Sequence, residues 1–364
     1  MKILLACGGT GGHIFPAISV AEELKRRDPR TEIVYVCGKK DIENSIFKMV
    51  IHEKVASVDS APFGRALSLL KPSFLIKLFQ GCAQSWRLLR DEKPQVVVGF
   101  GGYFSFPVML MAKLRGIRTL IHEQNVIPGV ANKFLARVVD GVALSYPDTQ
   151  EYMPRHGVMK VTGNPIRASI EKDCRQEALK YFNFSNEKTT VLVVGGSQGA
   201  ESINTFFLDA LKFLTGPIKE KIQVLHLCGK MGPESAQAVY RSSGIPAAVY
   251  SFFQRMDLAY GACDFSVGRA GATFLAEIAA KNIPAILIPY PYGSGHQLLN
   301  AQAFCKGSES VVVEQKDMTP EKLAQLLTEF SARGKAGRAD SSVGASGNAR
   351  ILLADFIQEN TVKK

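Results

Sequence analysis

Short runs of apolar residues alternate along the chain with longer segments in which apolar residues recur every three or four positions. The runs have the length of buried strands, and the longer segments have the period of helices. The strand candidates are residues 2–7, 32–37, 95–99, 117–121, 158–161, 190–194, 223–228, 263–267 and 284–288. Because strands and helices alternate, the pattern predicts an α/β protein whose parallel sheets carry helices on both faces.

A strand, a glycine-rich loop and a helix follow one another twice. Residues 2–7 lead into residues 8–12 (GGTGG), and residues 190–194 lead into residues 195–199 (GGSQG). Two such units in tandem predict two Rossmann-like domains that face a cleft. The turn-forming sequence at 162–165 (TGNP) marks the expected boundary between them.

We therefore expect an N-terminal domain of residues 1–163 and a C-terminal domain of residues 164–344, which suits the length of 364 residues. The periodicity does not decide which domain the amphipathic helix at 349–358 joins. Hydrophobic residues make up 46% of the chain and charged residues 21%, as in soluble globular proteins. We expect neither a signal peptide nor a membrane span. The seven cysteines form no C-x-x-C pair and indicate reduced thiols, without a zinc site or disulfides.

The net charge of +11 is unevenly distributed. Residues 1–163 hold 22 lysines and arginines against 14 aspartates and glutamates, a net +8, and the rest hold 22 against 19, a net +3. A basic half predicts an anionic partner there: nucleic acid, an acidic membrane surface or a phosphorylated substrate. A solvated basic surface is the simpler alternative.

Three glycine-rich loops, at residues 8–12, 99–102 and 195–199, each follow a strand candidate. Glycine allows close approach of a ligand to the backbone, and amides at the start of the next helix bind phosphate. No loop continues as a P-loop, and neither long loop spells G-x-G-x-x-G. The loops therefore favour a phosphate-bearing ligand and disfavour a nicotinamide-dependent oxidoreductase.

Three further polar segments follow strand candidates, where ligands of open α/β sheets bind. Residues 268–277 open a helix whose amides near Ala272 suit a diphosphate and whose Glu277 suits ribose hydroxyls. Residues 122–125 (HEQN) and Gln297 provide polar side chains at two other strand ends. Each also has an ordinary interpretation as a solvated loop or helix residue. The chain has no Asp-x-Asp pair, so we expect no metal and no cofactor.

Residues 72–90 are predicted to form an amphipathic helix. At 100° per residue its core stripe consists of Leu75, Leu78, Phe79, Cys82, Trp86 and Leu89. Phe74, Ile76 and Leu88 fall outside this stripe. An apolar surplus beside cations predicts a helix that rests on an anionic membrane. The predicted membrane contacts are Phe74, Ile76, Lys77 and Arg87. A core helix with a wide apolar stripe is the alternative.

Seven motifs follow one another along the chain: GGTGGH, GGYFSFP, HEQNVIPG, GNPIR, GGSQGA, RAGATFLAE and HQLLNA. In this order and spacing they closely resemble the MurG family of bacterial transferases, and the resemblance covers essentially the whole chain. It implies the GT-B fold, with a final helix at about residues 345–364 that returns to the N-terminal domain.

The resemblance also implies the reaction, an inverting transfer of N-acetylglucosamine from UDP-N-acetylglucosamine (UDP-GlcNAc). The acceptor is the C4 hydroxyl of the muramyl sugar of lipid I, undecaprenyl-pyrophosphoryl-MurNAc-pentapeptide, and the product is lipid II for peptidoglycan synthesis. The C-terminal domain would bind UDP-GlcNAc and the N-terminal domain lipid I. The protein would lie peripherally at the cytoplasmic face of the bacterial inner membrane, beside other cell-wall synthesis proteins and without nucleic acid.

The alternatives are a UDP-sugar 2-epimerase or a transferase with another acceptor on the same fold and, outside the enzymes, a nucleotide-sugar sensor. A nucleic-acid binder would explain the charge but not the glycine loops.

The family's functional positions carry over to this chain by motif. Donor contacts correspond to Thr10, Gly11, Gly12, Asn125, Arg167, Ser197, Phe253, Ala272, Thr273, Phe274, Leu275, Ala276, Glu277 and Gln297. Phe253 stands where the family reads uracil through the backbone. Gly101, Gly102, Tyr103 and Ser105 are expected to hold the acceptor diphosphate. Phe106 replaces the last glycine of the family's GGYxSGP and is expected to alter the approach of lipid I.

The acceptor hydroxyl needs a base to remove its proton. His13, at the first glycine loop, has a suitable pKa range for this role, and Glu123 is the rival base. A phosphate-binding or structural imidazole is the alternative for His13. Amides near Ala272 and Ser197 would stabilise the charge on departing UDP.

Overall fold

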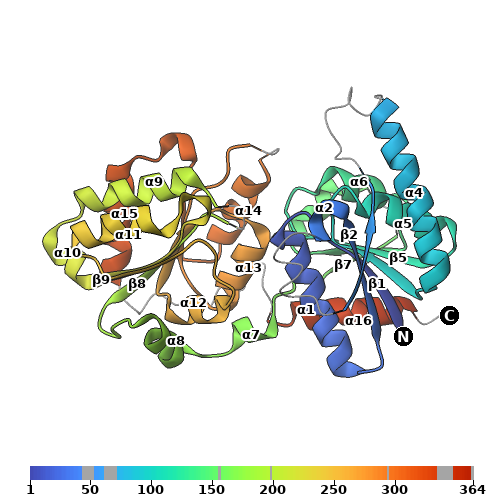
Figure 1. Cartoon of the computed structure of the whole chain (residues 1–364), viewed down its shortest axis with the longest axis horizontal. Coiled ribbons are helices and arrows are strands. Elements are labelled where there is room, and N and C mark those ends of the chain that lie inside the picture. The colour runs from blue at the N-terminus through green and yellow to red at the C-terminus, as the bar shows by residue number, and fades with distance from the viewer. Residues whose placement is uncertain are drawn as a thin grey trace. The chain divides into compact units, whose positions relative to one another are not determined.

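The computed structural model describes residues 1–42, 53–60, 72–154, 157–196, 199–292, 295–333 and 347–361. The chain divides into two compact units (Figure 1). Unit 1 consists of Met1–Arg167 with Ala345–Lys364, and unit 2 consists of Ala168–Gly344. The division after Arg167 lies a few residues beyond the boundary expected from the TGNP turn.

Unit 1 is built on a seven-stranded sheet whose strands all run parallel. Its strands are β1 (Lys2–Ala6), β2 (Glu32–Gly38), β3 (Lys54–Val58), β4 (Val96–Gly99), β5 (Arg118–Glu123), β6 (Gly141–Leu144) and β7 (Val158–Val161). Its helices are α1 (Gly11–Arg27), α2 (Lys39–Ile42), α4 (Pro72–Glu92), α5 (Ser105–Leu114), α6 (Val130–Leu135), the 3₁₀ helix η2 (Pro147–Tyr152) and α16 (Ala349–Thr361).

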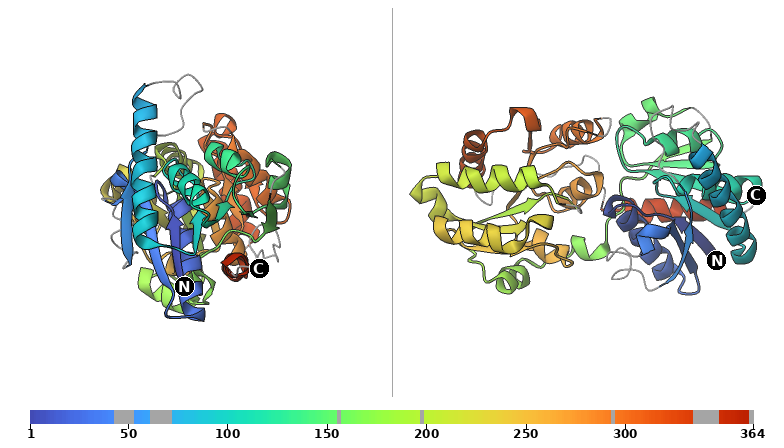
Figure 2. Two further views of the ribbon diagram at one scale, coloured as in Figure 1. Left: turned by 90° about the vertical axis from the view of Figure 1, so that its right-hand side faces the viewer. Right: turned by 45° about the horizontal axis from the view of Figure 1, so that its top comes forward.

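Helices cover both faces of this sheet (Figure 2). Because strand residues alternate between faces, Ile3 and Leu5 pack in one core with residues of α1 and α16, and Leu4 and Ala6 pack in another with residues of α4 and α5. Burial on both faces explains why the strands read as continuous apolar runs.

Unit 2 repeats the design with a six-stranded parallel sheet. Its strands are β8 (Thr189–Val194), β9 (Ile222–Leu227), β10 (Ala247–Tyr250), β11 (Phe265–Gly268), β12 (Ala285–Leu287) and β13 (Val311–Val312). Its helices are α7 (Ala168–Glu171), α8 (Arg175–Phe182), α9 (Glu201–Ala210), η3 (Leu211–Phe213), α10 (Gly216–Lys221), η4 (Gly229–Met231), α11 (Pro233–Ser243), α12 (Met256–Ala262), α13 (Ala272–Ala280), α14 (His296–Cys305), η5 (Gln315–Asp317) and α15 (Pro320–Arg333).

The strand order places a topological switch point in each sheet. The orders are β3-β2-β1-β4-β5-β6-β7 and β10-β9-β8-β11-β12-β13, so the chain reverses its direction of travel at β1/β4 and at β8/β11. Ligands of open parallel sheets bind outside the carboxyl ends of the strands at such points. The loops after β1, β4 and β8 are the three glycine-rich loops, and the predicted α/β fold with two Rossmann-like sheets is confirmed.

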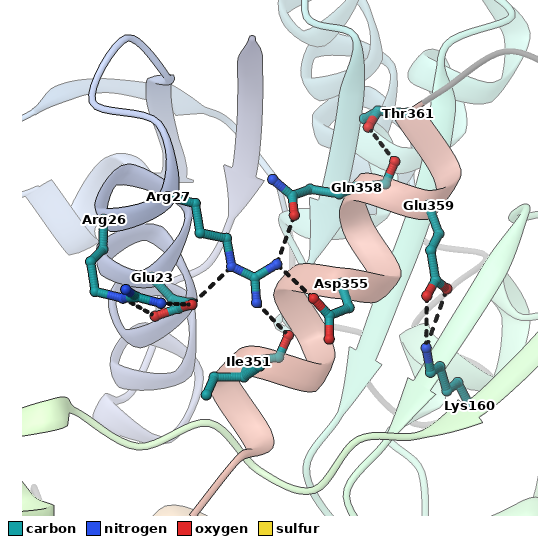
Figure 3. A network of polar contacts seen from close by, with 9 residues as sticks. All are labelled: Glu23, Arg26, Arg27, Lys160, Ile351, Asp355, Gln358, Glu359 and Thr361. Carbon is teal, nitrogen blue, oxygen red and sulfur yellow. Dashed lines mark hydrogen bonds and ion pairs between the residues drawn. The ribbon is translucent and has the colours of Figure 1, made fainter.

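The C-terminal helix α16 packs on α1 in unit 1, with Arg27 at the centre of the contact (Figure 3). Its guanidinium donates to Asp355 Oδ1 at 2.6 Å, to Gln358 Oε1 at 2.7 Å and to the Ile351 carbonyl at 3.1 Å. The same side chain donates to Glu23 at 2.8 Å. Hydrogen bonds from Arg26 and Arg27 lower the pKa of Glu23 to about 2.

The predicted core stripe of α4 is only partly right: Leu89 is buried as expected, and Leu78 and Cys82 are half-buried. Phe79, expected in the core, is 76% exposed, and Leu75 and Trp86 of the same stripe are also exposed. Besides Leu89, the buried residues of the helix are Phe74, Gly81, Ser85 and Glu92. A Cβ at position 81 would overlap the Asp59 carbonyl oxygen, so a glycine is needed for this close approach. Glycine and serine carry no hydrophobic signal, and the periodicity therefore displaced the predicted stripe away from Gly81 and Ser85, toward Leu75, Phe79 and Trp86.

One of the four expected membrane contacts is wrong. Phe74 is only 9% exposed and packs inward, so it is removed from the membrane-contact set. Ile76, Lys77 and Arg87 are exposed as expected. The N-terminal end of α4 projects beyond the neighbouring elements of unit 1 (Figures 1 and 2).

Candidate active site

The loop after β1 joins the switch point of unit 1 to the start of α1. Gly9 has a φ of +82°, which a residue with a side chain rarely adopts. Thr10 is the N-cap residue, and Gly11 and Gly12 form the first turn of α1. The positive end of the helix dipole therefore points to this loop, as a phosphate or a developing negative charge requires.

His13 lies in the same first turn, half-buried. Its Nδ1 is 3.0 Å from the Gly8 carbonyl oxygen, and because a carbonyl only accepts, Nδ1 carries the proton of the neutral ring. Nε2 then holds the lone pair. A Cβ at Gly101 would lie 3.2 Å from Nε2, so the glycine at 101 leaves room beside the basic nitrogen. This geometry fits a general base.

The second glycine loop, after β4, ends at the start of α5. Gly101 and Gly102 have φ angles of +96° and +84°. The fully buried Ser105 hydroxyl donates to the Gly102 carbonyl at 2.7 Å, so its role is to hold the loop rather than to present a hydroxyl. Tyr103 is half-buried, and burial raises the pKa of its phenol. Phe106 packs against the core on the α4–α5 face.

Glu123, the rival base, ends β5 and is 1% exposed. Its Oε1 accepts from the backbone and side-chain amides of Asn125 at 2.9 and 3.1 Å. Its Oε2 accepts from the Gly129 amide at 3.0 Å and from Asn132 Nδ2 at 2.9 Å. Four donors surround a carboxylate that has about four acceptor positions. The geometry therefore favours His13 as the base and leaves Glu123 to shape the loop that carries Asn125.

His122 and Gln124, which the sequence indicated as polar residues at a strand end, form a buried hydrogen-bonded group that we call the His122 network. His122 Nε2 donates to the Gly163 carbonyl at 3.0 Å, and Gln124 Nε2 lies 3.0 Å from His122 Nδ1 and 2.9 Å from the Phe100 carbonyl. Burial lowers the pKa of His122 to about 4, so the ring is neutral at pH 7. The HEQN motif was a signal for this site, but its burial was not visible.

Arg167 ends unit 1 and contacts α1. Its guanidinium carbon lies 4.3 Å from the centroid of the Phe15 ring, within cation–π distance. Phe15 is two residues beyond His13 in the same helix. The structure thus places Arg167 beside the helix that carries the first glycine loop.

In unit 2, the loop after β8 includes Gly196 and Gly199, with φ angles of +91° and +74°. Ser197, an expected donor contact, lies outside the described residues. After β11, Gly271 is the N-cap of α13, and the expected contacts Ala272, Thr273, Phe274, Leu275, Ala276 and Glu277 form its first two turns. The Tyr260 hydroxyl donates to Glu277 Oε2 at 2.7 Å, which orients the carboxylate.

Two further loops of unit 2 reach the same edge of the sheet. Phe253, after β10, is buried in an aromatic cluster in which the rings of Tyr250 and Phe182 lie 5.0 and 5.3 Å from its own. After β12, Gln297 Oε1 accepts from the Tyr290 amide at 2.9 Å. The predicted donor residues of unit 2 that the structure describes therefore all follow the carboxyl ends of strands of one parallel sheet.

The sequence did not indicate the structural role of Arg269. Its buried guanidinium donates to the carbonyls of Ile288 and Pro289 at 2.9 and 3.1 Å. It also donates to Ser202 Oγ at 2.8 Å and Gln315 Oε1 at 2.7 Å. Arg269 thus fastens the loop after β12 to the first turn of α9.

Within the described ranges, no group of three or more His, Cys, Asp and Glu side chains is placed to hold a metal ion. Nor does any helix in those ranges have the length and apolar content to cross a bilayer.

Comparisons with known proteins match both units. Residues 3–144 match the model of the glycosyltransferase family 28 N-terminal domain, and residues 190–350 match that of the C-terminal domain. Two relatives, from Citrifermentans bemidjiense and Geobacter sp. strain M21, are each 36% identical to this chain. The match to the first relative covers all of both chains. The match to the second covers 99% of this chain and 96% of the relative. Both are named UDP-N-acetylglucosamine--N-acetylmuramyl-(pentapeptide) pyrophosphoryl-undecaprenol N-acetylglucosamine transferase.

Solved structures agree with this result. The crystal structure of Acinetobacter baumannii MurG is 28% identical, with a TM-score of 0.75 and coverage of 98% of this chain and 99% of that chain. A UDP-GlcNAc 2-epimerase from Neisseria meningitidis, 13% identical with a TM-score of 0.69, shares the fold alone.

Proposed function

The chain belongs to the MurG family, within glycosyltransferase family 28, and we propose that it moves GlcNAc from UDP-GlcNAc to lipid I to give lipid II. One observation carries this conclusion: relatives of this activity match over the full length of both chains. The glycine-rich loops of this chain follow β1, β4 and β8, strands that form the switch points of the two sheets, where ligands of such sheets bind.

Unit 2 binds the donor in this proposal. The amides at the start of α13, together with the loop after β8 that contains Ser197, take the diphosphate, because helix N-termini stabilise negative charge. Glu277, oriented by Tyr260, accepts hydrogen bonds from the ribose hydroxyls. The backbone at Phe253 reads uracil, and Gln297 contacts the sugar.

Unit 1 binds the acceptor and provides the base. His13 Nε2 takes the proton of the C4 hydroxyl while the hydroxyl oxygen attacks the anomeric carbon of GlcNAc. The bond from that carbon to the diphosphate breaks, and UDP leaves with the bonding electrons. Because the hydroxyl attacks the face opposite UDP, the configuration at that carbon inverts. Thr10, Gly11, Gly12, Asn125 and Arg167 are the proposed donor contacts from this unit.

The acceptor diphosphate is assigned to the second glycine loop. Gly101, Gly102 and Tyr103 supply backbone amides in this proposal, and Ser105 contributes through the start of α5, since its hydroxyl is turned inward. Phe106, in the first turn of α5, packs on the core. We expect a side chain at this position, where the family has glycine, to alter the approach of lipid I.

The exposed side of α4 is the proposed membrane contact at the cytoplasmic face of the bacterial inner membrane. Leu75, Ile76, Phe79 and Trp86 are all exposed on it. Lys77 and Arg87 are exposed on the same helix, and the Arg115 guanidinium lies 4.7 Å from the Trp86 ring centroid. Apolar residues flanked by cations suit a surface of anionic lipids.

The test is transfer of radiolabel from UDP-GlcNAc to a lipid I analogue, with EDTA present to remove divalent metal. Label in the lipid product supports donor, acceptor and metal independence together. Conversion of UDP-GlcNAc to its 2-epimer, or hydrolysis without transfer, would overturn the assignment of lipid I as acceptor while retaining the UDP-sugar site.

A further inference from the structure

A row of buried polar side chains lies beneath the donor loops of unit 2, apart from every residue assigned above. Tyr240 of α11, His226 of β9 and Asn204 of α9 are each at most 1% exposed. The Tyr240 hydroxyl lies 2.8 Å from His226 Nδ1, and His226 Nε2 lies 3.1 Å from Asn204 Oδ1. Asn204 Nδ2 in turn donates to the Cys228 carbonyl at 2.8 Å. We call these four groups the His226 relay.

The Cys228 carbonyl sets the direction of every hydrogen bond in the relay. A carbonyl only accepts, so the NH₂ group of Asn204 faces it and Oδ1 faces His226. His226 Nε2 must then carry the ring proton, and Nδ1 accepts from the Tyr240 hydroxyl. Burial lowers the pKa of His226 to about 4, which keeps the ring neutral and this single arrangement intact at pH 7.

The relay ends at a turn that lies between two donor loops. Beyond Cys228, Gly229 approaches the glycine loop after β8 so closely that a Cβ at Gly199 would be 3.1 Å from its Cα. On the other side, the Cys228 amide and thiol both donate to the Tyr250 carbonyl, at 2.9 and 3.4 Å. Tyr250 ends β10, three residues before Phe253, so the turn separates the proposed diphosphate loop from the proposed uracil loop.

We propose that Asn204, His226 and Tyr240 are positioning residues for UDP binding, because they fix the Cys228–Gly229 turn against which both loops rest. The inference rests on the proposed function of unit 2 as the UDP-GlcNAc site. Neutral buried hydrogen bonds suit this role, because they hold the backbone in one place without introducing a charge that would compete with the helix N-termini for the diphosphate.

The decisive variant is Asn204→Ala, which removes the link between His226 and the turn. We expect the Kd for UDP and the KM for UDP-GlcNAc to rise about tenfold, the ratio that corresponds to one lost hydrogen bond. The KM for the lipid I analogue should stay unchanged, because the acceptor is bound by unit 1.

The matched control is Gln223→Ala at the opposite end of β9. Gln223 is also a buried amide that donates to a backbone carbonyl, that of Ser185 at 2.7 Å. This variant should lower the Tm of the protein as Asn204→Ala does, without changing the Kd for UDP. Two outcomes would overturn the proposal: a Kd for UDP in Asn204→Ala equal to that of the wild type, or the same increase in this Kd in both variants.

A milder variant, Tyr240→Phe, covers the case in which Asn204→Ala does not fold. It removes one hydroxyl from the far end of the relay, and we expect a roughly twofold to threefold rise in the Kd for UDP. An unchanged Kd in this variant would also overturn the proposal.

Binding and transfer together separate this inference from the proposed function. If the wild-type protein binds UDP but fails to label lipid I, the acceptor assignment fails, and the Kd series still decides the role of the relay. If the wild-type protein does not bind UDP, both fail.

Discussion

The two units use the same scaffold and differ in what they place at its edge. Each has a parallel sheet with one switch point, glycine loops after the central strands, and a buried neutral histidine beneath those loops, His122 in unit 1 and His226 in unit 2. Unit 1 adds an imidazole, His13, in the first turn of the helix that follows its glycine loop. Unit 2 instead adds a carboxylate, Glu277, in the second turn of α13.

In the proposed function, this difference divides the reaction between two copies of one fold. A glycine loop and a helix N-terminus suit phosphate binding in either unit, since both present backbone amides. The proposal assigns chemistry and selectivity to one side chain that lies one or two turns further along a helix. The comparison can be tested by changing these side chains, and the expected effects fall into a clear order.

The largest effect is expected for His13→Ala, which removes the proposed base from unit 1. The turnover number should fall by about 100-fold to 10,000-fold, the usual contribution of a general base, while the Kd for UDP changes little. Steady-state kinetics with a lipid I analogue, together with calorimetry, would show this split. An unchanged turnover number would remove His13 from the mechanism.

Next in size is the effect of Glu277→Gln in unit 2. Loss of a charged hydrogen-bond acceptor should raise the KM for UDP-GlcNAc roughly tenfold or more, with a smaller change in turnover number. The matched variant Glu123→Gln should act differently. The NH₂ group of the glutamine would replace an oxygen that accepts hydrogen bonds, and the donors around it would lose their acceptor. Unit 1 should therefore lose about 1–3 kcal/mol of stability. Similar donor KM values for Glu277→Gln and wild type would contradict the assignment of Glu277.

The membrane contact belongs to unit 1 alone in the proposal, and Phe79→Asp tests it. Because a buried phenylalanine contributes about 1.5–3 kcal/mol, binding to vesicles with anionic lipid should weaken roughly tenfold or more. Co-sedimentation with vesicles measures this loss. Phe213→Asp, at an exposed phenylalanine of unit 2, is the control and should leave binding unchanged.

A smaller effect is expected for Arg27→Leu, which disconnects α16 from α1. The loss of charged hydrogen bonds to Asp355 and Glu23 should lower the unfolding free energy of unit 1 by about 1–2 kcal/mol. A fully buried ion pair would contribute more, but Asp355 is partly exposed and solvent screens its charge. Calorimetry should show the transition of unit 1 shifted and that of unit 2 unchanged. A shift of both transitions would contradict the location of α16 in unit 1.

The pH dependence of stability should be shared by the two units, and it separates them least. His122 and His226 have pKa values of about 4 in the folded protein, against about 6.5 for an unperturbed histidine. The unfolded chain therefore binds more protons between these values, and stability falls as pH drops from about 6.5 to about 4, by at most about 1.4 kcal/mol per pH unit for each histidine. Glu23 acts in a lower window, between about 4.5 and about 2.

Urea unfolding across this pH range measures the effect. Replacing His226 by Gln should flatten the pH dependence of unit 2 and leave that of unit 1 unchanged. A slope that persists in this variant would mean that other groups cause it.

The sequence by itself determined the class of fold, the glycine loops and the family. Apolar runs such as residues 95–99 and 190–194 specify buried parallel strands because both faces of each strand must be covered. The glycine loops could be predicted from the sequence because Gly9, Gly101 and Gly199 have positive φ angles, which most other residues do not adopt. Such features depend on the type of residue at each position and on its near neighbours in the sequence.

Tertiary structure decided which side of α4 is buried and what each polar residue does. The helix packs through Gly81 and Ser85, whose small size matters only beside the Asp59 carbonyl and α5. The sequence predicted His13 as the base and Glu123 as its rival, and only the structure shows that four donors surround Glu123 and that His13 Nε2 lies beside a glycine. Such roles depend on neighbours distant in sequence, because hydrogen bonding and burial are properties of the packed chain and not of the residue alone.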